Sequence, residues 1–298
     1  MCQDCGCTQI GSIEIDGKNA DALPQRESLV RSHSHSEHPS ERSQPPSSDR
    51  DPHLHSHIPH PTPRTLSIHQ GILSKNDRLA ERNREFFQAK DLLVLNLLSS
   101  PGSGKTSLIE QMAKDFADAR PPDWTSPMRL GVIVGDLATD NDSQRLRQAG
   151  PTAVQITTGN ACHLEAEMVA RSLTQLNTDE LDLLMIENVG NLVCPAGYDL
   201  GEALRVVVLS TTEGEDKPLK YPTIFKTADI VLINKIDVAA AVGCDLARAI
   251  ANVQQVAPQA KVFKVSARTG AGMMSWYADL IGSMFAKPVS KQEQPERV

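Results

Sequence analysis

Short, continuous runs of apolar residues recur along the chain from about residue 91 onward. They read DLLVLNLLS, RLGVIVGD, AVQITT, LDLLMIEN, LRVVVLS, IVLINK and KVFKVSA. A strand buried on both faces of a parallel sheet has this pattern, because neither of its faces meets water. We therefore predict strands beginning near residues 91, 129, 153, 181, 204, 230 and 261.

Segments with helical spacing of apolar residues separate several of these runs. They are 104–118, 142–149, 162–176, 244–256 and 272–284. Before the first strand, SKNDRLAERNREFFQAK reads as a polar helix, with Ser74 or Asn76 as a candidate N-terminal cap. Strands that alternate with helices predict an α/β fold, with a mostly parallel sheet flanked by helices.

The N-terminal part of the chain lacks this pattern. Residues from about 20 to 65 are rich in Ser, Pro, Arg, Glu and His and poor in large apolar side chains. Such a segment buries too little surface to offset its ordering entropy, so we predict disorder. We divide the chain into a Cys-rich motif (1–10), a disordered His-rich linker (11–74), a folded domain (75–286) and a flexible tail (287–298).

Size and charge narrow the class of protein. The chain has 298 residues and a net charge of −7, which gives no general footprint for nucleic acid. No apolar run reaches the roughly 18 residues that a membrane span needs, and the N-terminus lacks the apolar segment of a secretory signal. We therefore expect a cytoplasmic protein, in which clustered cysteines serve metal binding or redox chemistry rather than disulfides.

A glycine-rich turn follows the first predicted strand, in LLVLNLLSSPGSGKTSLIEQM. Glycines let backbone N–H groups approach phosphate oxygens, and the N-terminus of the next helix attracts anions. We expect Lys105 to reach the β- and γ-phosphates and Thr106 to ligate Mg²⁺. Ser99 stands where the strict Walker A pattern has its first glycine. The phosphate-binding residues that we predict are Gly102, Ser103, Gly104, Lys105, Thr106 and Ser107.

The run IVLINKID ends in an N-K-x-D set, which is typical of guanine recognition. The Asp237 carboxylate can accept from both N1–H and the exocyclic amine of guanine, a donor pair that adenine lacks. Lys235 can cover the base, and Asn234 can brace the loop. The stretch VSARTG resembles the loop that backs the base in GTPases, so we add Ser266 and Ala267 to the site.

Acidic residues follow two other predicted strands. Glu187 ends LDLLMIEN, where the Walker B carboxylate is expected, although common GTPases have Asp there. Direct and water-mediated contact with Mg²⁺ both stay open. In VIVGDLATDND, Asp136 and Asp142 are candidates for orienting the attacking water or holding Mg²⁺, and a solvated acidic loop is the alternative. We expect Lys105, Asp136, Asp142 and Glu187 to carry GTP hydrolysis.

Cys162 and His163 begin a predicted helix, and Cys194 lies seven residues after Glu187. Adjacent residues do not share a helix face, which favours a metal site that two chains complete. A two-fold axis would present each ligand twice, a set suited to Zn²⁺ or Ni²⁺. The alternative is that the cysteines are small core residues and His163 is a surface residue.

The N-terminal part carries two further candidate metal sites. Imidazoles suit Ni²⁺, Zn²⁺ and Cu²⁺, and a flexible chain can wrap several of them around one ion. A polar linker is the alternative for this stretch. The C-x-x-C-x-C motif can place three thiolates on one Ni²⁺ or Cu²⁺ ion, with a redox dithiol as the rival. The residues are Cys2, Cys5, Cys7, His33, His35, His38, His53, His55, His57 and His60.

Together these motifs resemble the hydrogenase maturation GTPases that deliver nickel to [NiFe]-hydrogenase. The resemblance covers MCQDCGC, the His-rich stretch, SSPGSGKT, TTGNACHLEAEM, IENVGNLVCP, EGEDKPLKYP, NKID and SARTG. It implies a P-loop NTPase that forms a homodimer on GTP, and nickel storage in the His-rich stretch. It also implies a tight Ni²⁺ site at the N-terminal cysteines and a second metal site at Cys162, His163 and Cys194.

The resemblance implies as partners a companion nickel/zinc maturation chaperone and the hydrogenase large subunit. In this hypothesis GTP closes a dimer, and hydrolysis releases nickel. One alternative is a related GTPase that serves urease, which usually lacks the N-terminal cysteine motif. Another is a nickel-storage protein with a vestigial nucleotide site, against which Lys105, Thr106 and Asp237 argue.

Overall fold

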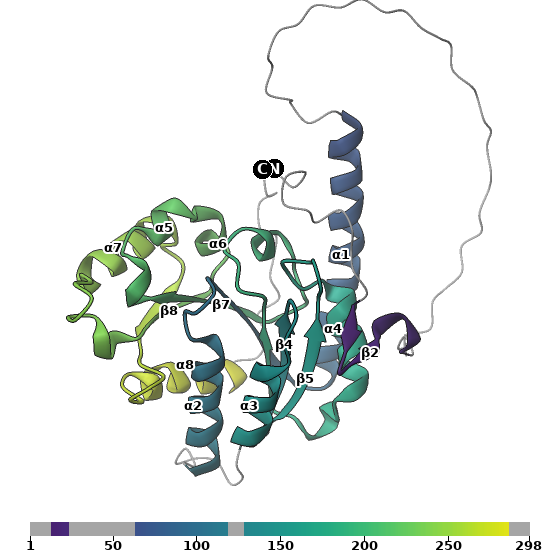
Figure 1. Cartoon of the computed structure of the whole chain (residues 1–298), viewed down its shortest axis with the longest axis horizontal. Helices are drawn as coiled ribbons and strands as arrows, with labels where there is room; N and C mark the ends of the chain where they lie inside the picture. The colour runs from purple at the N-terminus through teal and green to yellow at the C-terminus, as the bar shows by residue number, and fades with distance from the viewer. Residues whose placement is uncertain (1–12, 24–62, 119–127, 286–298) are drawn as a thin grey trace, which may run out of the picture.

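A computed structural model of the protein describes residues 13–23, 63–118 and 128–285. These residues build an α/β fold around one nine-stranded sheet (Figure 1). The strand order is β2-β1-β5-β4-β6-β3-β7-β8-β9. The strands are β1 (Glu14–Ile15), β2 (Lys18–Asn19), β3 (Leu93–Ser99), β4 (Leu130–Asp136), β5 (Thr152–Thr157), β6 (Leu183–Glu187), β7 (Leu204–Ser210), β8 (Ile230–Asn234) and β9 (Lys261–Lys264).

The strands predicted from apolar runs are all present, as β3 to β9, and they pair in parallel. Every residue of β6 and of β8 is buried, as expected for strands covered on both faces. The predicted fold class is therefore confirmed. Because all these strands run the same way, their carboxyl ends meet at one edge of the sheet, where loops can gather functional side chains.

Helices cover both faces of the sheet (Figure 1). One face carries α2, α3 and α8, and the other carries α1 and α4 beside α6 and α7. None of the helices in the described ranges is long and apolar enough to cross a bilayer. The helices are α1 (Pro63–Ala89), α2 (Lys105–Asp118), α3 (Asn141–Ala149), α4 (Ala166–Ser172), α5 (Lys217–Lys220), α6 (Pro222–Lys226), α7 (Leu246–Val256) and α8 (Met273–Phe285).

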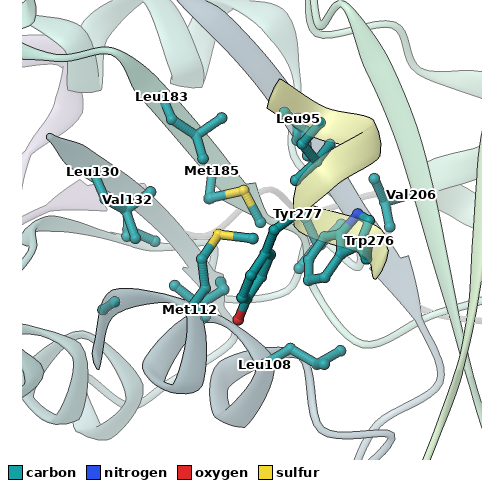
Figure 2. Packing of buried hydrophobic residues seen from close by; sticks show 14 of the residues in the cluster. Leu95, Leu108, Met112, Leu130, Val132, Leu183, Met185, Val206, Trp276 and Tyr277 are labelled. Carbon is teal, nitrogen blue, oxygen red and sulfur yellow. The ribbon is translucent and has the colours of Figure 1, made fainter. Parts of the chain in front are cut away.

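The largest core cluster lies between α2, α8 and the sheet, and Figure 2 shows its packing. Trp276 and Tyr277 of α8 reach toward Leu108 and Met112 of α2 (Figure 2), and all four side chains are almost fully buried. The Tyr277 hydroxyl donates to Asp115 Oδ2 at 2.8 Å, so its one polar group is paired. This packing fixes α2, whose first residues carry the predicted phosphate loop.

The prediction of a disordered linker over 11–74 is wrong at residues 13–23. Strands β1 and β2 form a hairpin that adds antiparallel to β5, with Glu14 opposite Thr157. Its turn, Asp16-Gly17, has φ of 46° and 72°. An Asp-Gly pair after alternating apolar and polar residues is a strong hairpin signal, and SIEIDGK contains it. The sequence interpretation missed this signal because the surrounding composition is so polar.

The hairpin is attached to the domain by both apolar and polar contacts. Ile15 is fully buried in the cluster beneath α1 and α4. Asp16 Oδ1 accepts from the backbone N–H of Gln155 at 2.9 Å and from Arg147 Nη2 at 2.7 Å. Arg171 of α4 pairs with Asp21 at 3.0 Å. Sheet pairing, a buried side chain and two ion pairs together explain why this short segment folds.

Helix α1 begins at Pro63, so the domain boundary at 75 and the caps at Ser74 and Asn76 are also wrong. Asn76 lies inside the helix and is 4 % exposed. Its Nδ2 donates to Asp199 O at 2.8 Å, and its Oδ1 accepts from Ala166 N at 2.9 Å. Asn76 therefore satisfies a donor at the N-terminus of α4 and docks α1 onto that helix.

Candidate functional site

The predicted phosphate loop connects β3 to the N-terminus of α2. Gly102 and Gly104 have φ of 73° and 100°, a region that suits glycine. A Cβ on Gly104 would lie 2.7 Å from Asn234 Nδ2, so this position also needs glycine for space. Asn234 Nδ2 donates to Ser103 O at 2.9 Å. The phosphate loop is thus braced by the first residue of the N-K-x-D set.

Lys105 lies in the first turn of α2 and is 7 % exposed. Its Nζ donates to Ser99 Oγ at 2.8 Å, so the serine that replaces the first Walker glycine holds the lysine. Burial lowers the pKa of Lys105, and the charges of Glu187 and Asp142 partly offset this effect. An ammonium with few protein partners in a buried loop is suited to a polyanionic ligand.

Glu187, at the carboxyl end of β6, faces Thr106. Thr106 Oγ1 donates to Glu187 Oε1 at 2.8 Å. The second carboxylate oxygen, Oε2, is buried and has no hydrogen-bond partner among the described residues. Burial raises the pKa of Glu187 to about 7, although Lys105 and Thr106 act in the opposite direction. A hydroxyl beside a buried carboxylate oxygen that lacks a partner fits a divalent cation with oxygen ligands, such as Mg²⁺.

Asp136 and Asp142 lie near this site but have partners in their own segment. Asp136 accepts from Leu137 N at 2.5 Å and from Thr139 Oγ1 at 2.6 Å, which folds the loop after β4. Asp142 lies in the first turn of α3 and pairs with Arg145 at 3.4 Å. Both carboxylates act on the Lys105 charge from this edge of the sheet. Their roles in hydrolysis stay predictions.

The predicted base-binding residues come together at the ends of β8 and β9. Asp237 Oδ1 accepts from Ser266 Oγ at 2.6 Å, which orients the carboxylate. Asn234 Oδ1 accepts from Ala267 N at 3.2 Å, and this joins the two loops. Lys235 has φ of 63°, and its Nζ donates to Gly102 O at 2.7 Å. Hydrogen bonds therefore join the phosphate loop to the loops after β8 and β9, which carry the predicted base-binding residues.

The structure places the ligand atoms of Cys162, His163 and Cys194 within 4.8 Å of one another. One chain therefore brings all three ligands together although Cys162 and His163 are adjacent, and the completion of the site by a second chain stays a prediction. The reason is local: α4 begins at Ala166, so Cys162 and His163 lie in the preceding loop and no helix constrains their directions. Cys194 begins the short 3₁₀ helix η4 (Cys194–Gly197).

Two residues that the sequence interpretation missed surround His163. Its ring stacks on Tyr198, with centroids 3.8 Å apart and planes inclined by 30°. Its Nε2 lies 3.7 Å from Glu165 Oε1, and its Nδ1 lies 3.8 Å from Cys162 Sγ. No spacing in the sequence predicts the contact with Tyr198, because the two residues come from different loops.

The segment from Glu187 to Cys194 connects the predicted nucleotide site to the candidate metal cluster. Asn188 Oδ1 accepts from Leu164 N at 3.2 Å, and Asn191 Nδ2 donates to Cys162 O at 3.4 Å. Gly190 packs on the phosphate loop, since a Cβ there would lie 2.9 Å from Pro101 Cα. This connecting segment, 188–193, touches both the phosphate loop and the loop with Cys162.

The other predicted metal ligands lie outside the described residues. They are Cys2, Cys5, Cys7, His33, His35, His38, His53, His55, His57 and His60.

Comparison with known proteins agrees with this geometry. Residues 93–264 match the family model described as CobW/HypB/UreG, nucleotide-binding domain. The chain is 45 % identical over 286 residues to the hydrogenase maturation factor HypB of Azotobacter vinelandii, spanning 93 % of this chain and 91 % of that one. It is 51 % identical over 215 residues to HypB of Azotobacter chroococcum mcd 1, covering 72 % and 68 % of the two chains.

A solved structure is similar as well. The crystal structure of HypB from Helicobacter pylori in complex with nickel superposes with a TM-score of 0.67 at 39 % identity, covering 74 % of this chain and 100 % of that one. The matched family model spans the phosphate loop, the three-residue metal cluster and the N-K-x-D set. The chain therefore belongs to the CobW/HypB/UreG family, within which it is one of the HypB hydrogenase maturation factors.

Proposed function

We propose that this protein is a GTP-hydrolysing nickel metallochaperone that delivers Ni(II) to the large subunit of [NiFe]-hydrogenase. The observation that supports this best is the connecting segment 188–193. It joins Glu187 to Cys194 and contacts both Pro101 and the Cys162 loop. Loss of the γ-phosphate can therefore alter the position of the metal ligands through segment 188–193.

The nucleotide site supplies the switch. The phosphate loop and Lys105 bind the phosphates, and Asp237 accepts from the guanine edge. Thr106 and Glu187 would hold Mg²⁺, which supplies charge neutralisation at the phosphate oxygens. Asp136 and Asp142 are the candidates for orienting the attacking water. In-line hydrolysis needs such positioning and charge stabilisation rather than a covalent intermediate.

The metal cluster holds the cargo. Two thiolates and one imidazole suit Ni²⁺ or Zn²⁺, and these three ligands leave room for a fourth. In a GTP-bound homodimer the clusters of two chains meet, and hydrolysis relaxes segment 188–193 and lets nickel leave. Nickel then passes to a companion nickel/zinc maturation chaperone or to the hydrogenase large subunit.

The N-terminal part extends this role. Cys2, Cys5 and Cys7 hold one nickel ion tightly, and the histidines between 33 and 60 store further nickel. Binding of metal by these side chains releases protons, so we expect both affinities to fall at acidic pH.

The test is a nickel titration of the full chain carrying Cys2→Ala, Cys5→Ala and Cys7→Ala, with GDP or a non-hydrolysable GTP analogue bound. Thiolate-to-nickel absorption then reports the internal cysteines. We expect the nickel affinity to differ at least about 5-fold between the two nucleotides, the lower end of typical coupling between sites. Equal affinities would refute the coupling.

A second measurement separates the metallochaperone from a storage protein. GTP turnover should be measurable in the parent chain and should fall in the Lys105→Ala variant, because the β- and γ-phosphates lose their cation. Absence of turnover in the parent chain would favour nickel storage with a vestigial nucleotide site.

A further inference from the structure

The two nitrogens of the His163 ring face different chemical groups. Nδ1 lies 3.8 Å from Cys162 Sγ, on the side of the thiols. Nε2 lies 3.7 Å from Glu165 Oε1, and it is buried without a hydrogen-bond partner among the residues that the structure describes. The ring therefore lies between the metal cluster and a carboxylate.

Glu165 has the N-cap position of α4 but does not act as a cap. Its side chain makes no capping hydrogen bond. By contrast, Asp245 at the start of α7 accepts from Arg248 N in the usual way. The Glu165 carboxylate instead points to the imidazole. Because the Glu165 side chain does not cap the helix, its carboxylate is available to interact with His163.

Tyr198 supports the ring from its flat side and is itself held firmly. Its carbonyl accepts from Arg205 Nη2 at 2.7 Å, and Ala196 O accepts from Arg205 Nη1 at 3.1 Å. Arg205 is 6 % exposed and pairs with Glu202. Arg205 of β7, paired with Glu202 just before that strand, thus fixes the backbone of the segment that carries both Cys194 and Tyr198.

A histidine that ligates a metal nearly always donates its other ring N–H to a carboxylate or carbonyl, which selects the tautomer and the ring orientation. An acceptor close to Nε2, with Nδ1 toward the thiols, matches this arrangement. We propose that Glu165 and Tyr198 are the positioning residues of the nickel site: Glu165 accepts from His163 Nε2–H so that Nδ1 binds nickel, and Tyr198 sets the plane of the ring. This inference rests on the proposed function of the Cys162, His163 and Cys194 cluster.

The experiment uses the full chain with Cys2→Ala, Cys5→Ala and Cys7→Ala, titrated with Ni²⁺ against a chromophoric chelator. We expect Glu165→Ala to weaken nickel binding about 10- to 100-fold, the usual effect of losing such a partner. Glu165→Gln should lose less, because its amide oxygen still accepts a hydrogen bond. Glu85→Ala, an exposed carboxylate on α1, is the matched control and should change nothing.

The Tyr198 variants test the stacking contact. Tyr198→Phe keeps the ring and should bind nickel like the parent chain. Tyr198→Leu removes the ring and should weaken binding and shift the thiolate-to-nickel absorption band. Binding of GDP by each variant serves as the folding control, since neither residue contributes to the nucleotide site.

Three outcomes are decisive. Affinities of Glu165→Ala and Tyr198→Leu within twofold of the parent would overturn the inference. Glu165→Gln losing as much affinity as Glu165→Ala would also overturn it, because a hydrogen-bond acceptor at this position would then not preserve nickel binding. If instead Cys162→Ala leaves the absorption band unchanged, the cluster itself is not the nickel site; the proposed function then fails, and the positioning roles that rest on it fail with it.

Discussion

At the scale of single residues, Glu187 is a buried carboxylate at the predicted Mg²⁺ position. Its carboxylate is 5 % exposed, and one of its oxygens lacks a hydrogen-bond partner in the described part of the chain. Burial raises its pKa from 4.5 to about 7. A buried carboxylate oxygen without a hydrogen-bond partner is costly, and such groups are common at ligand sites.

The Glu187→Gln variant should therefore be more stable than the metal-free parent chain at alkaline pH. Because the folded pKa lies above the unfolded one, the contribution of Glu187 to stability is present below pH 4.5 and is lost as pH rises through 7. The difference in free energy of unfolding should reach about 3 kcal/mol at pH 8. Urea denaturation with EDTA at several pH values measures it; a pH-independent difference would contradict the assignment.

A second prediction at this scale concerns Gly190 and the rate of GTP turnover. Gly190→Ala should lower GTP turnover by about 10- to 100-fold, because its Cβ would press segment 188–193 off the Pro101 backbone. Steady-state phosphate release measures this change. Gly282→Ala, where nothing lies within 4 Å of the added Cβ, is the control and should keep full activity. Unchanged turnover in Gly190→Ala would show that this contact is not needed.

At the scale of elements, the contact between α1 and α4 contains a partly exposed charge network. Glu167 accepts from Arg171 at 2.7 Å and from Lys75 at 3.0 Å. These hydrogen bonds, first that of Arg171, lower the pKa of Glu167. Asn76 and Asn83 form hydrogen bonds across the same contact, so polar groups help to align the two helices beside the apolar side chains that they bury.

Glu167→Gln should destabilise the domain at neutral pH by about 1 kcal/mol or less, since such pairs are partly solvated. A lowered folded pKa means that the contribution is present above the unfolded value and is lost as pH falls through the folded one. The parent chain and the variant should therefore converge in acid. Thermal unfolding at pH 7 and in acid tests this. A gap that persists in acid would point to packing instead.

The hairpin β1–β2 is the element that most enlarges the domain beyond its predicted bounds. Ile15→Ala should cost about 2–4 kcal/mol, because Ile15 is fully buried and its loss leaves a cavity under α4. Lys18→Ala, at an exposed strand position, should cost almost nothing. Urea titration of both variants measures the free energy of unfolding. Equal values for Ile15→Ala and Lys18→Ala would mean that the hairpin is not attached to the domain in solution.

At the scale of the whole molecule, the sheet edge gathers both sites and presents them outward. Val193, next to Cys194, is 63 % exposed. An exposed apolar side chain beside the metal cluster suits a contact between two chains, as the proposed GTP-bound homodimer requires. In the proposed homodimer, the nucleotide site, the metal cluster and Val193 then all lie at the same contact between the two chains.

Val193→Asp should weaken GTP-driven dimerisation at least about 10-fold, because it places a desolvated charge in the contact. Light scattering with a GTP analogue measures the mass. Val242→Asp, at a residue that is 47 % exposed in the loop before α7, is the control and should dimerise normally. Dimers of undiminished affinity in Val193→Asp would place the interface elsewhere.

The sequence alone determined the strands β3 to β9, the phosphate loop and the N-K-x-D set. These features depend on local spacing: apolar runs bury both faces of a strand, and glycines permit the positive φ values of a tight loop. Dependence on local spacing also explains which elements were predicted wrongly. The polar surroundings of SIEIDGK concealed the hairpin, and α4 begins at Ala166, four residues after the start that the sequence predicts at Cys162.

Only the tertiary structure decided which residues form the candidate metal cluster. Cys162 and Cys194 lie 32 positions apart, and they meet because Leu164 packs on Gly135 of β4 while Asn188 binds the Leu164 N–H from the end of β6. Such contacts depend on strand order, which no local spacing encodes. The roles that we infer for Glu165 and Tyr198 arise in the same way, from side chains that approach His163 only when the sheet has formed.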